Sequence, residues 1–468
     1  MYVARHAYNP IYKLSNPCQP QIGLQIYNIL NIAVNSLTYF KSKSNFVRRF
    51  LILLLNLSDY IFTIMNKIKV GILRETKTPP DRRVALPPKF ALQVLESFPN
   101  VELFIQPSDI RAFTDQEYLD LGFTCQEDLS NCDILIGVKE VKIQTLIPGK
   151  TYLYFSHTAK KQEHNRTLLQ ANIQNKIRLI DYEYITDKNG MRLVAFGRWA
   201  GVVGAYNAIL AVGRDTGNFR LRRAHECFDM EEFFNELHQA KLPNYKFLIT
   251  GGGRVAGGAM EVLDFLKIQK VSPEDFLEKN YDFPVYTQLD PWHYVKRKDG
   301  EKFEWEHFAR YPETYESVFL PYAKTADVLI ACHFWDPNSP KFLTKDQMKD
   351  SEINLKMIAD VSCDLNGSIP TTIRTSTIED PFWKFNVGQW KEADVDDSES
   401  ITIMTIDNLP GEAPRDASED FAKTLIEKVF PSLFGEDKDG IIERATITTV
   451  EGKLTKKFAY LQDFVNGK

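Results

Sequence analysis

The feature that most constrains the fold of this chain is a run of glycines at 251–253, between a strand-like apolar segment and a helical pattern. Gly251 permits a tight turn, and Gly253 lets the backbone approach a ligand. Gly257 or Gly258 would let the helix lie close to the strand, and the helix N-terminus presents unpaired N–H groups. This order is typical of a site for a dinucleotide pyrophosphate. Because the third glycine comes one residue late, a purely structural turn stays an alternative.

A second strand-like segment, 285–289, ends in Asp290. An acidic residue here commonly accepts hydrogen bonds from the adenosine ribose and repels a 2′-phosphate, so we expect NAD rather than NADP. The distance from the glycines exceeds the usual spacing because residues 272–283 intervene, and an ordinary turn aspartate is the alternative. By position, the predicted cofactor-binding residues of this block are Gly251, Gly253, Arg254, Val255, Gly257 and Asp290.

Length and composition exclude several classes of protein. A chain of 468 residues is too long for one hydrophobic core, so we expect two domains. The net charge of −5 offers no basic surface for nucleic acid. Six cysteines without a CxxC pair predict reduced thiols, hence a cytoplasmic location, and neither a disulfide framework nor a metal site.

Residues 1–64 differ in composition from the rest of the chain. They contain no acidic residue before Asp59, and their apolar run at 50–65 is interrupted by Asn56 and Asp59. That run is shorter than the ~20 apolar residues of a spanning helix. Met65 directly precedes a strand-like segment, so we predict that 1–64 are translated from upstream of the true start; a targeting or anchoring segment is the alternative. For 65–468 we expect no membrane association.

From Lys67 onward, strand-like segments such as 151–155 alternate with helix-like segments at 88–97, 115–121 and 161–172. This alternation predicts an α/β fold with mostly parallel sheets. In such sheets ligands lie beyond the carboxyl ends of the strands. Three predicted strands end just before or at Lys139, His157 and Glu183, so we expect these side chains at one edge. We predict two Rossmann-like domains with an active-site cleft between them. The substrate domain comprises 65–205 and 400–468, and the NAD-binding domain comprises 206–399.

Several short motifs occur in a familiar order. They are Leu-Arg-Glu-Thr-Lys at 73–77 leading to Arg-Val-Ala-Leu at 83–86, Gly-Val-Lys-Glu at 137–140, Phe-Ser-His at 155–157, Val-Ser-Cys-Asp at 361–364 and Ile-Asp-Asn-Leu-Pro at 406–410. From Lys67 to about residue 434 the chain resembles the family of alanine dehydrogenase, the transhydrogenase NAD-binding subunit and lysine-forming saccharopine dehydrogenase. The pieces at 181–185, 192–197 and 414–418 look most like saccharopine dehydrogenase. Insertion 292–321 and connection 206–245 depart from the family pattern.

The resemblance implies roles for individual residues. Lys139 and His157 match the proton-carrying residues; a solvated lysine paired with Glu140 and a structural histidine are the alternatives. Arg83 matches an arginine that binds a substrate carboxylate, and its neighbour Arg82 is expected at the surface; an exchange of the two roles is the alternative. Lys77 and Arg192 match further carboxylate-binding positions, with a surface role for either as the alternative. Glu183 would bind the substrate amino group or serve as a buried structural carboxylate. Asp364 would lie beside the nicotinamide ribose or orient the substrate.

The resemblance also implies a reaction and leaves alternatives open. It is the NAD-dependent oxidation of saccharopine, with water, to lysine, 2-oxoglutarate and NADH. The alternatives are an alanine-type amino-acid dehydrogenase and a non-catalytic NAD-binding subunit. The expected partner is a small amino-acid or oxo-acid substrate. Homo-oligomerisation and the direction in the cell are left open.

Overall fold

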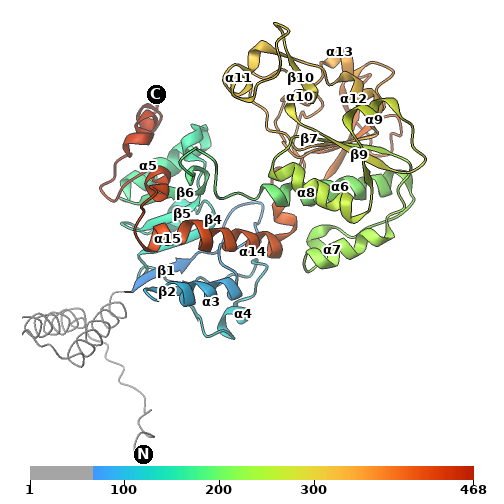
Figure 1. Cartoon of the computed structure of the whole chain (residues 1–468). Helices are drawn as coiled ribbons and strands as arrows, with labels where there is room; N and C mark the ends of the chain where they lie inside the picture. The colour runs from blue at the N-terminus through green and yellow to red at the C-terminus, as the bar shows by residue number, and fades with distance from the viewer. Residues whose placement is uncertain (1–66) are drawn as a thin grey trace, which may run out of the picture.

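The computed structural model describes residues 67–468, which form two α/β lobes (Figure 1). The predicted extension 1–64 lies outside the described residues. Between residues 67 and 468, no helix is long and apolar enough to cross a membrane.

The first lobe is built on a six-stranded sheet whose strand pairs are all parallel. Its order is β3-β2-β1-β4-β5-β6. The strands are β1 (Ile68–Ile72), β2 (Val101–Ile105), β3 (Thr124–Cys125), β4 (Ile134–Lys139), β5 (Thr151–Phe155) and β6 (Arg178–Asp181). The central strands are buried almost throughout, because crossover helices cover both faces of a parallel sheet.

The helices of this lobe begin close to the predicted positions, with one difference. Helices α3 (Pro88–Ser97) and α4 (Asp115–Leu119) start where the sequence indicates, and Thr114 and Glu117 form a capping box at α4. Helix α5 (Arg166–Gln174) was expected from residue 161. It starts later because Lys161 adopts a left-handed conformation, φ 56°, which a continuing helix cannot contain.

The second lobe contains an eight-stranded, mostly parallel sheet of order β15-β14-β16-β13-β12-β7-β9-β8. Only β14 pairs in the antiparallel sense, with β15 and β16. The strands are β7 (Lys246–Thr250), β8 (Gln269–Lys270), β9 (Val285–Leu289), β12 (Val328–Ala331), β13 (Met357–Asp360), β14 (Phe382–Asn386), β15 (Lys391–Ala393) and β16 (Ile401–Met404). The predicted α/β class with two mostly parallel sheets is confirmed.

The strand pairing corrects the predicted boundary at residue 400. Strand β16 pairs with β13 and so completes the second sheet rather than returning to the first lobe. The return follows 3₁₀ turn η8 (Leu409–Glu412), because Phe421 on helix α14 (Pro414–Thr424) joins the hydrophobic core of the first sheet. Beyond it, α15 (Phe430–Phe434), α16 (Ile441–Ala445) and α17 (Gln462–Val465) complete that lobe.

Helix α6 (Gly197–Thr216) corrects the other boundary, at 205/206. The helix is continuous through that point, and its buried side chains belong to the core of the second lobe. It crosses helix α8 (Arg254–Phe265) at very short range: a Cβ on Gly201 would lie 1.8 Å from the carbonyl oxygen of Val255. The second lobe therefore begins near residue 197, because α6 covers its sheet.

The insertion 292–321 forms a separate small unit on the second lobe. It contains most of α10 (Pro291–Tyr294), hairpin strands β10 (Val295–Arg297) and β11 (Tyr315–Ser317), and α11 (Trp305–Arg310). Other helices of this lobe are α7 (Met230–Glu236), α9 (Pro273–Glu278), α12 (Leu320–Thr325) and α13 (Lys345–Met348).

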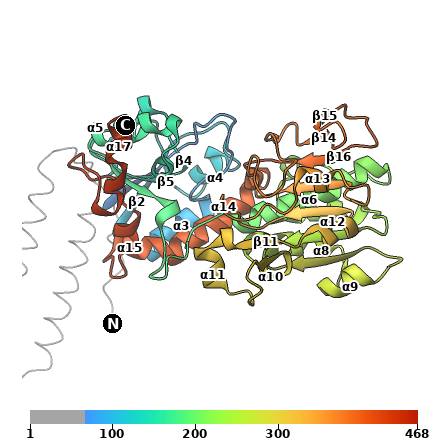
Figure 2. The same ribbon diagram turned by 90° about the horizontal axis from the view of Figure 1, so that it is seen from above.

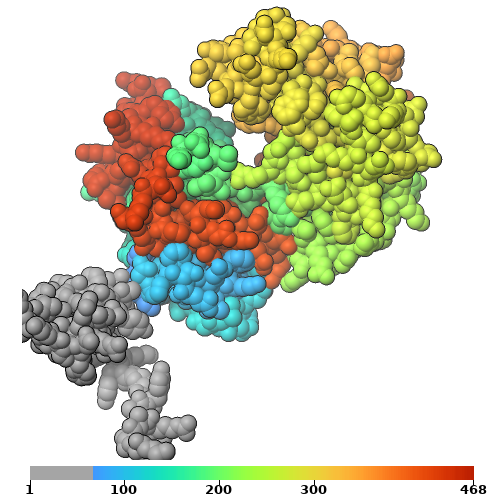
Figure 3. Space-filling model, viewed as in Figure 1, coloured from blue at the N-terminus to red at the C-terminus, as the bar shows by residue number. Residues whose placement is uncertain are grey.

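The two lobes lie side by side and meet along α6, η8 and α14 (Figure 2). The indole Nε1 of Trp199 on α6 donates to Asp420 on α14 over 3.2 Å, which ties the two lobes at this junction. Above the junction a cleft separates them in the space-filling view (Figure 3).

Candidate active site

The charged end of the first sheet is formed by three neighbouring strands. Lys139 is the last residue of β4, His157 follows β5 by two residues, and Glu183 follows β6 by two residues. Strand β5 pairs with both β4 and β6 in parallel, so the three carboxyl ends meet at one edge. The structure therefore brings these three predicted residues to the same sheet edge.

His157 and Glu183 form a pair at this edge. The Nδ1 atom of His157 lies 3.3 Å from Oε2 of Glu183. Lys160 and Arg192 lie 3.1 Å and 3.6 Å from its other oxygen. Burial raises the pKa of Glu183, but His157 and these two cations outweigh it and hold that pKa at about 2. The ionised carboxylate can only accept, so Nδ1 of His157 must donate, which leaves Nε2 for proton exchange.

The backbone that carries this pair is held by Asp181, a residue the sequence reasoning missed. Its carboxylate accepts from the backbone N–H of Ser156 (3.1 Å), the hydroxyl of Ser156 (2.5 Å) and the backbone N–H of Glu183 (2.8 Å). These bonds tie the end of β5 to the end of β6. They also frame the left-handed turn at His157, where φ is 54°. The signal in the sequence was a lone aspartate ending an apolar strand.

Lys139 is held in a similar way by Glu75, which was also missed. The Glu75 carboxyl accepts from the backbone N–H groups of Val138 (2.7 Å) and Lys139 (2.9 Å). Burial and the charge of Asp81 raise the pKa of Glu75 to about 8. Burial, with the charges of Arg83 and Lys77, lowers the pKa of Lys139 to about 8. Lys139 can therefore exchange a proton near neutral pH.

Arg83 lies on the loop after β1, where it is buried in an ion pair. Its Nε and Nη2 donate to Asp81 over 2.9 Å and 2.5 Å, and Nη2 also donates to Asn408 over 2.8 Å. Its guanidinium lies 4.3 Å from the ring centroid of Phe196. Burial raises the pKa of Asp81, but the charge and hydrogen bonds of Arg83 hold it well below its usual range. The neighbouring Arg82 is exposed, as expected.

The two remaining predicted cations are more accessible. Lys77 pairs with Glu140 over 3.1 Å, and Arg192 is exposed apart from its pairing with Glu183. The carbonyl oxygen of Arg192 accepts a hydrogen bond from Nη2 of Arg254, 3.2 Å away, at the start of α8. This contact places the start of α8 beside the charged edge of the first sheet.

The glycine-rich turn after β7 has the backbone geometry expected for a close-approach loop. Gly251 has φ 92°, and a Cβ there would lie 2.8 Å from the carbonyl oxygen of Cys332. A Cβ on Gly252 would lie 2.1 Å from Oδ1 of Asp290. Gly253 precedes the first residue of α8, and nothing lies within 4 Å of its Cβ position. The turn therefore leaves open space in front of the helix N-terminus, with the Asp290 carboxylate beside it.

Gly258, not Gly257, allows the close packing of α8. The element that α8 contacts there is helix α6, not the strand that was expected. A Cβ on Gly258 would lie 2.0 Å from the carbonyl oxygen of Arg198 on α6. Nothing lies within 4 Å of a Cβ on Gly257. The sequence does not show which of the two glycines makes the close contact, because the crossing of α6 and α8 has no local pattern.

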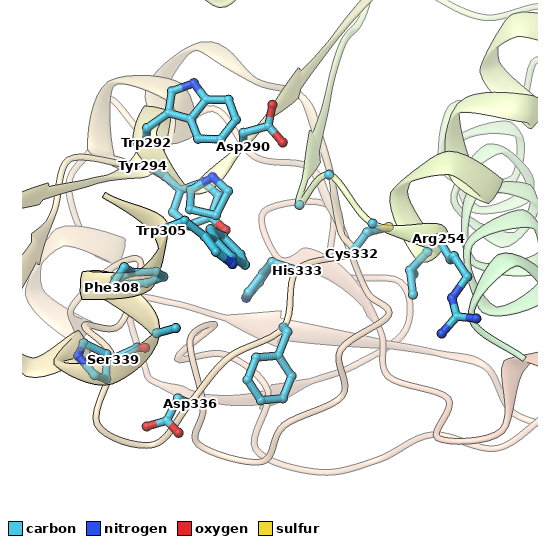
Figure 4. A pocket seen from close by; sticks show the side chains of 18 residues that line it. Arg254, Asp290, Trp292, Tyr294, Trp305, Phe308, Cys332, His333, Asp336 and Ser339 are labelled. Carbon is cyan, nitrogen blue, oxygen red and sulfur yellow. The ribbon is translucent and has the colours of Figure 1, made fainter. Parts of the chain in front are cut away.

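A pocket of about 810 Å³ opens in front of this turn (Figure 4). The residues 251–255 and Asp290 line it, together with aromatic side chains from insertion 292–321. The buried His333 also lines it, between the hydroxyls of Thr250 (2.8 Å) and Ser368 (2.6 Å), and burial lowers its pKa to about 3. Asp364, on the loop after β13, is not among the lining residues; burial and Asp360 raise its pKa.

The pocket fits a dinucleotide in its volume and in the order of its phosphate- and ribose-binding groups. Its volume falls within the ~300–1,000 Å³ of small-molecule sites. The helix N-terminus and Arg254 suit a pyrophosphate, and Asp290 suits ribose hydroxyls. The residues that could hold the adenosine half therefore lie together.

Comparisons with known proteins find similar sequences and similar folds. Residues 71–203 match the family described as alanine dehydrogenase/PNT, N-terminal domain. A mitochondrial alpha-aminoadipic semialdehyde synthase of Mus musculus is 31% identical over 444 residues, which cover 85% of this chain and 48% of the relative. A lysine-forming, NAD(+) saccharopine dehydrogenase of Yarrowia lipolytica is 25% identical over 392 residues, covering 78% of this chain and 91% of the relative.

Among solved structures, an L-alanine dehydrogenase superposes with a TM-score of 0.56 at 14% identity, covering 85% of this chain and 99% of the other. That likeness concerns the fold. The chain spans about half the length of the mouse relative. The resemblance inferred from the motifs is thus confirmed: residues 71–203 match the alanine dehydrogenase/PNT N-terminal domain family, and most of the chain is similar in sequence to a saccharopine dehydrogenase.

Proposed function

We propose that this chain is an NAD-dependent oxidoreductase that acts on the CH–NH group of an amino acid, with saccharopine as the substrate. One observation carries the proposal. The charged edge with Lys139 and the His157–Glu183 pair lies next to the glycine-rich pocket, joined to it by the hydrogen bond from Arg254 to Arg192. The proton-exchanging groups are therefore linked to a pocket suited to a dinucleotide, because Arg192 also pairs with Glu183.

Gly251, Gly253, Arg254, Val255 and Asp290 would hold NAD in this pocket. Asp290 favours NAD because its carboxylate would accept from a ribose hydroxyl and repel the 2′-phosphate of NADP. Gly257 leaves open space on the same helix, and Asp364 would lie by the nicotinamide ribose or orient the substrate. When bound, the dinucleotide accepts a hydride from the carbon next to the amine nitrogen.

The chain's own residues would move the protons. Lys139, with its pKa of about 8, has a neutral fraction that can take the proton of the substrate amine. His157 holds Nδ1 toward Glu183, so its Nε2 can accept a proton from the water that attacks the resulting imine. Return of a proton to the departing nitrogen breaks the C–N bond and yields lysine and 2-oxoglutarate. Water supplies the oxygen of the new oxo group, and the hydride supplies NADH.

The cations of the first lobe would bind the substrate carboxylates, of which saccharopine has three. Lys77 and Arg192 are accessible, whereas two nitrogens of Arg83 are committed to Asp81 and Asn408. Since Glu183 is already surrounded by His157, Lys160 and Arg192, we assign it to orienting His157 rather than to the substrate amino group.

A substrate panel with the full chain tests this proposal. Saccharopine with NAD, lysine plus 2-oxoglutarate with NADH, and pyruvate plus ammonia with NADH are compared by absorbance at the NADH band. We expect turnover with the first two pairs. Turnover only with pyruvate and ammonia would favour an alanine-type dehydrogenase, and NADH binding without any turnover would favour a non-catalytic subunit. Equal or better efficiency with NADP would remove the role assigned to Asp290.

We also propose a cytoplasmic location, because the five cysteines within residues 67–468 are unpaired. Fractionation of cells that express the full chain tests this location. Self-association stays open and is measured by sedimentation of the same chain.

A further inference from the structure

The insertion 292–321 contributes one wall of the pocket. Trp305, Phe308, Ala309 and Pro312 all line it, at spacings of three, four and seven residues from the first. Such spacing puts them on one face of α11 and the turn that follows. Figure 4 shows Trp292, Tyr294, Trp305 and Phe308 together on one side of the pocket, with Arg254 on the other.

The insertion packs around Phe303, Phe308 and Tyr315, whose ring centroids lie 4.9–5.7 Å apart. The two tryptophans of this wall lie at the edge of that cluster, with ring centroids 6.0 Å (Trp292) and 6.3 Å (Trp305) from that of Phe303. Trp305 is 61% exposed and Trp292 is 52% exposed. Exposed apolar side chains gathered around a pocket are typical of a ligand-binding surface.

The pocket presents its groups in the order of an adenosine diphosphate. The helix N-terminus and Arg254 suit phosphates, Asp290 suits the ribose, and Trp292 follows Asp290 by two residues. We propose that the insertion binds the purine ring of the adenosine half of the cofactor, with Trp305 as the main stacking surface. This inference rests on the proposed dinucleotide binding.

The lining argues against an amino-acid substrate at this wall. Its charged residues are Arg254, Asp290 and Asp336, and Arg254 lies at the opposite side from the aromatic cluster. A substrate carboxylate would meet the two aspartates near an apolar surface. A purine ring carries no charge and has two faces that stack on indole.

Calorimetric titration of the full chain with AMP, ADP-ribose, NADH and nicotinamide mononucleotide tests the inference. Trp305→Ala should weaken binding of the first three by about tenfold or more, the usual effect of losing one base–aromatic stack. Trp305→Phe should stay within about threefold, because it keeps a ring. Binding of nicotinamide mononucleotide should not change. Tyr311→Ala is the matched control, since Tyr311 is an exposed aromatic of the same insertion that does not line the pocket.

A second measurement does not depend on a variant that folds. AMP should quench the tryptophan emission of the unmodified chain and should displace NADH competitively, which also separates the dinucleotide site from a distinct site for free adenine nucleotides. Unchanged affinity for AMP and NADH in Trp305→Ala would overturn the purine site while leaving the proposed function intact. Absence of NADH binding to the unmodified chain would overturn both.

Discussion

The two sheets obey the same topological rule but differ in the chemistry at their carboxyl ends. The end of the first sheet gathers charge, with Lys139, Arg83 and the His157–Glu183 pair held by buried carboxylates. The end of the second sheet gathers glycines and aromatic rings around one pocket. One edge is therefore suited to moving protons and binding carboxylates, and the other to binding phosphates and a flat ring.

The difference shows that the fold provides a location and the loops provide the chemistry. In the first lobe, the carboxyl groups of Glu75 and Asp181 fix the backbone that carries Lys139, His157 and Glu183. In the second lobe the backbone itself lies open at Gly253, and side chains from an insertion complete the wall. Substitutions at the first edge should therefore change catalysis and substrate binding, and substitutions at the second edge should change cofactor binding.

The largest expected effect separates chemistry from cofactor binding. Lys139→Met and His157→Gln should each lower kcat by about 10²–10⁴, the usual contribution of a positioned acid or base, with the Kd for NADH little changed. Steady-state kinetics and calorimetry measure the two quantities. The exposed neighbours Lys142→Met and His164→Gln serve as controls. Full activity in the double variant Lys139→Met/His157→Gln would remove the catalytic assignment and favour a non-catalytic binding subunit.

The next effect tests whether Arg83 binds the substrate or stabilises the fold. Arg83→Ala should raise KM for the carboxylate substrate and also lower the free energy of unfolding by about 3–5 kcal/mol, since it leaves the buried Asp81 without its partner. Urea unfolding and kinetics measure both. Exposed Arg82→Ala should change stability by less than about 0.5 kcal/mol.

A double variant separates the two roles of Arg83. Asp81→Asn/Arg83→Met removes the unpaired charge and should recover part of the stability while KM stays high. Recovery of a normal KM as well would show that Arg83 acts only through the fold.

A smaller effect compares two adjacent glycines of the second lobe. Gly258→Ala should lower the free energy of unfolding by about 1–3 kcal/mol, because its methyl group would overlap the carbonyl oxygen of Arg198. Gly257→Ala should raise it by up to about 1 kcal/mol, because alanine favours the helix and meets open space. Thermal unfolding of the two variants compares them directly; equal losses would contradict the observed crossing of α6 and α8.

The smallest effect concerns pH at the charged edge. If neutral Lys139 takes the substrate proton, kcat/KM for amine oxidation should rise about tenfold between pH 7 and the plateau above its pKa of about 8. The neutral fraction grows as pH rises through that pKa, which sets the sign. In Lys139→Met this limb should disappear, and a limb unchanged in that variant would assign the titration to another group.

The sequence predicted the regular elements well because each carries a local signal. Strand β5 and helix α3 have the predicted bounds, and β9 ends at Leu289, directly before Asp290, as predicted. The boundaries at 205 and 400 were wrong because they depend on strand pairing and helix crossing between distant segments. Neither the pairing of β16 with β13 nor the burial of α6 leaves a local pattern.

In the candidate site, too, some residues were predicted from local signals and others were not. Lys139, His157 and Glu183 were predicted to share an edge from strand order alone. Their partners were not predicted, because Glu75 and Asp181 act on backbone N–H groups of other strands and Asn408 reaches Arg83 from 325 residues away. By itself, then, the sequence determined the α/β class, the glycine turn and which residue types end each strand, since all of these are local. Only the tertiary structure decided how those side chains are held and that the insertion closes the pocket, because both depend on contacts between distant parts of the chain.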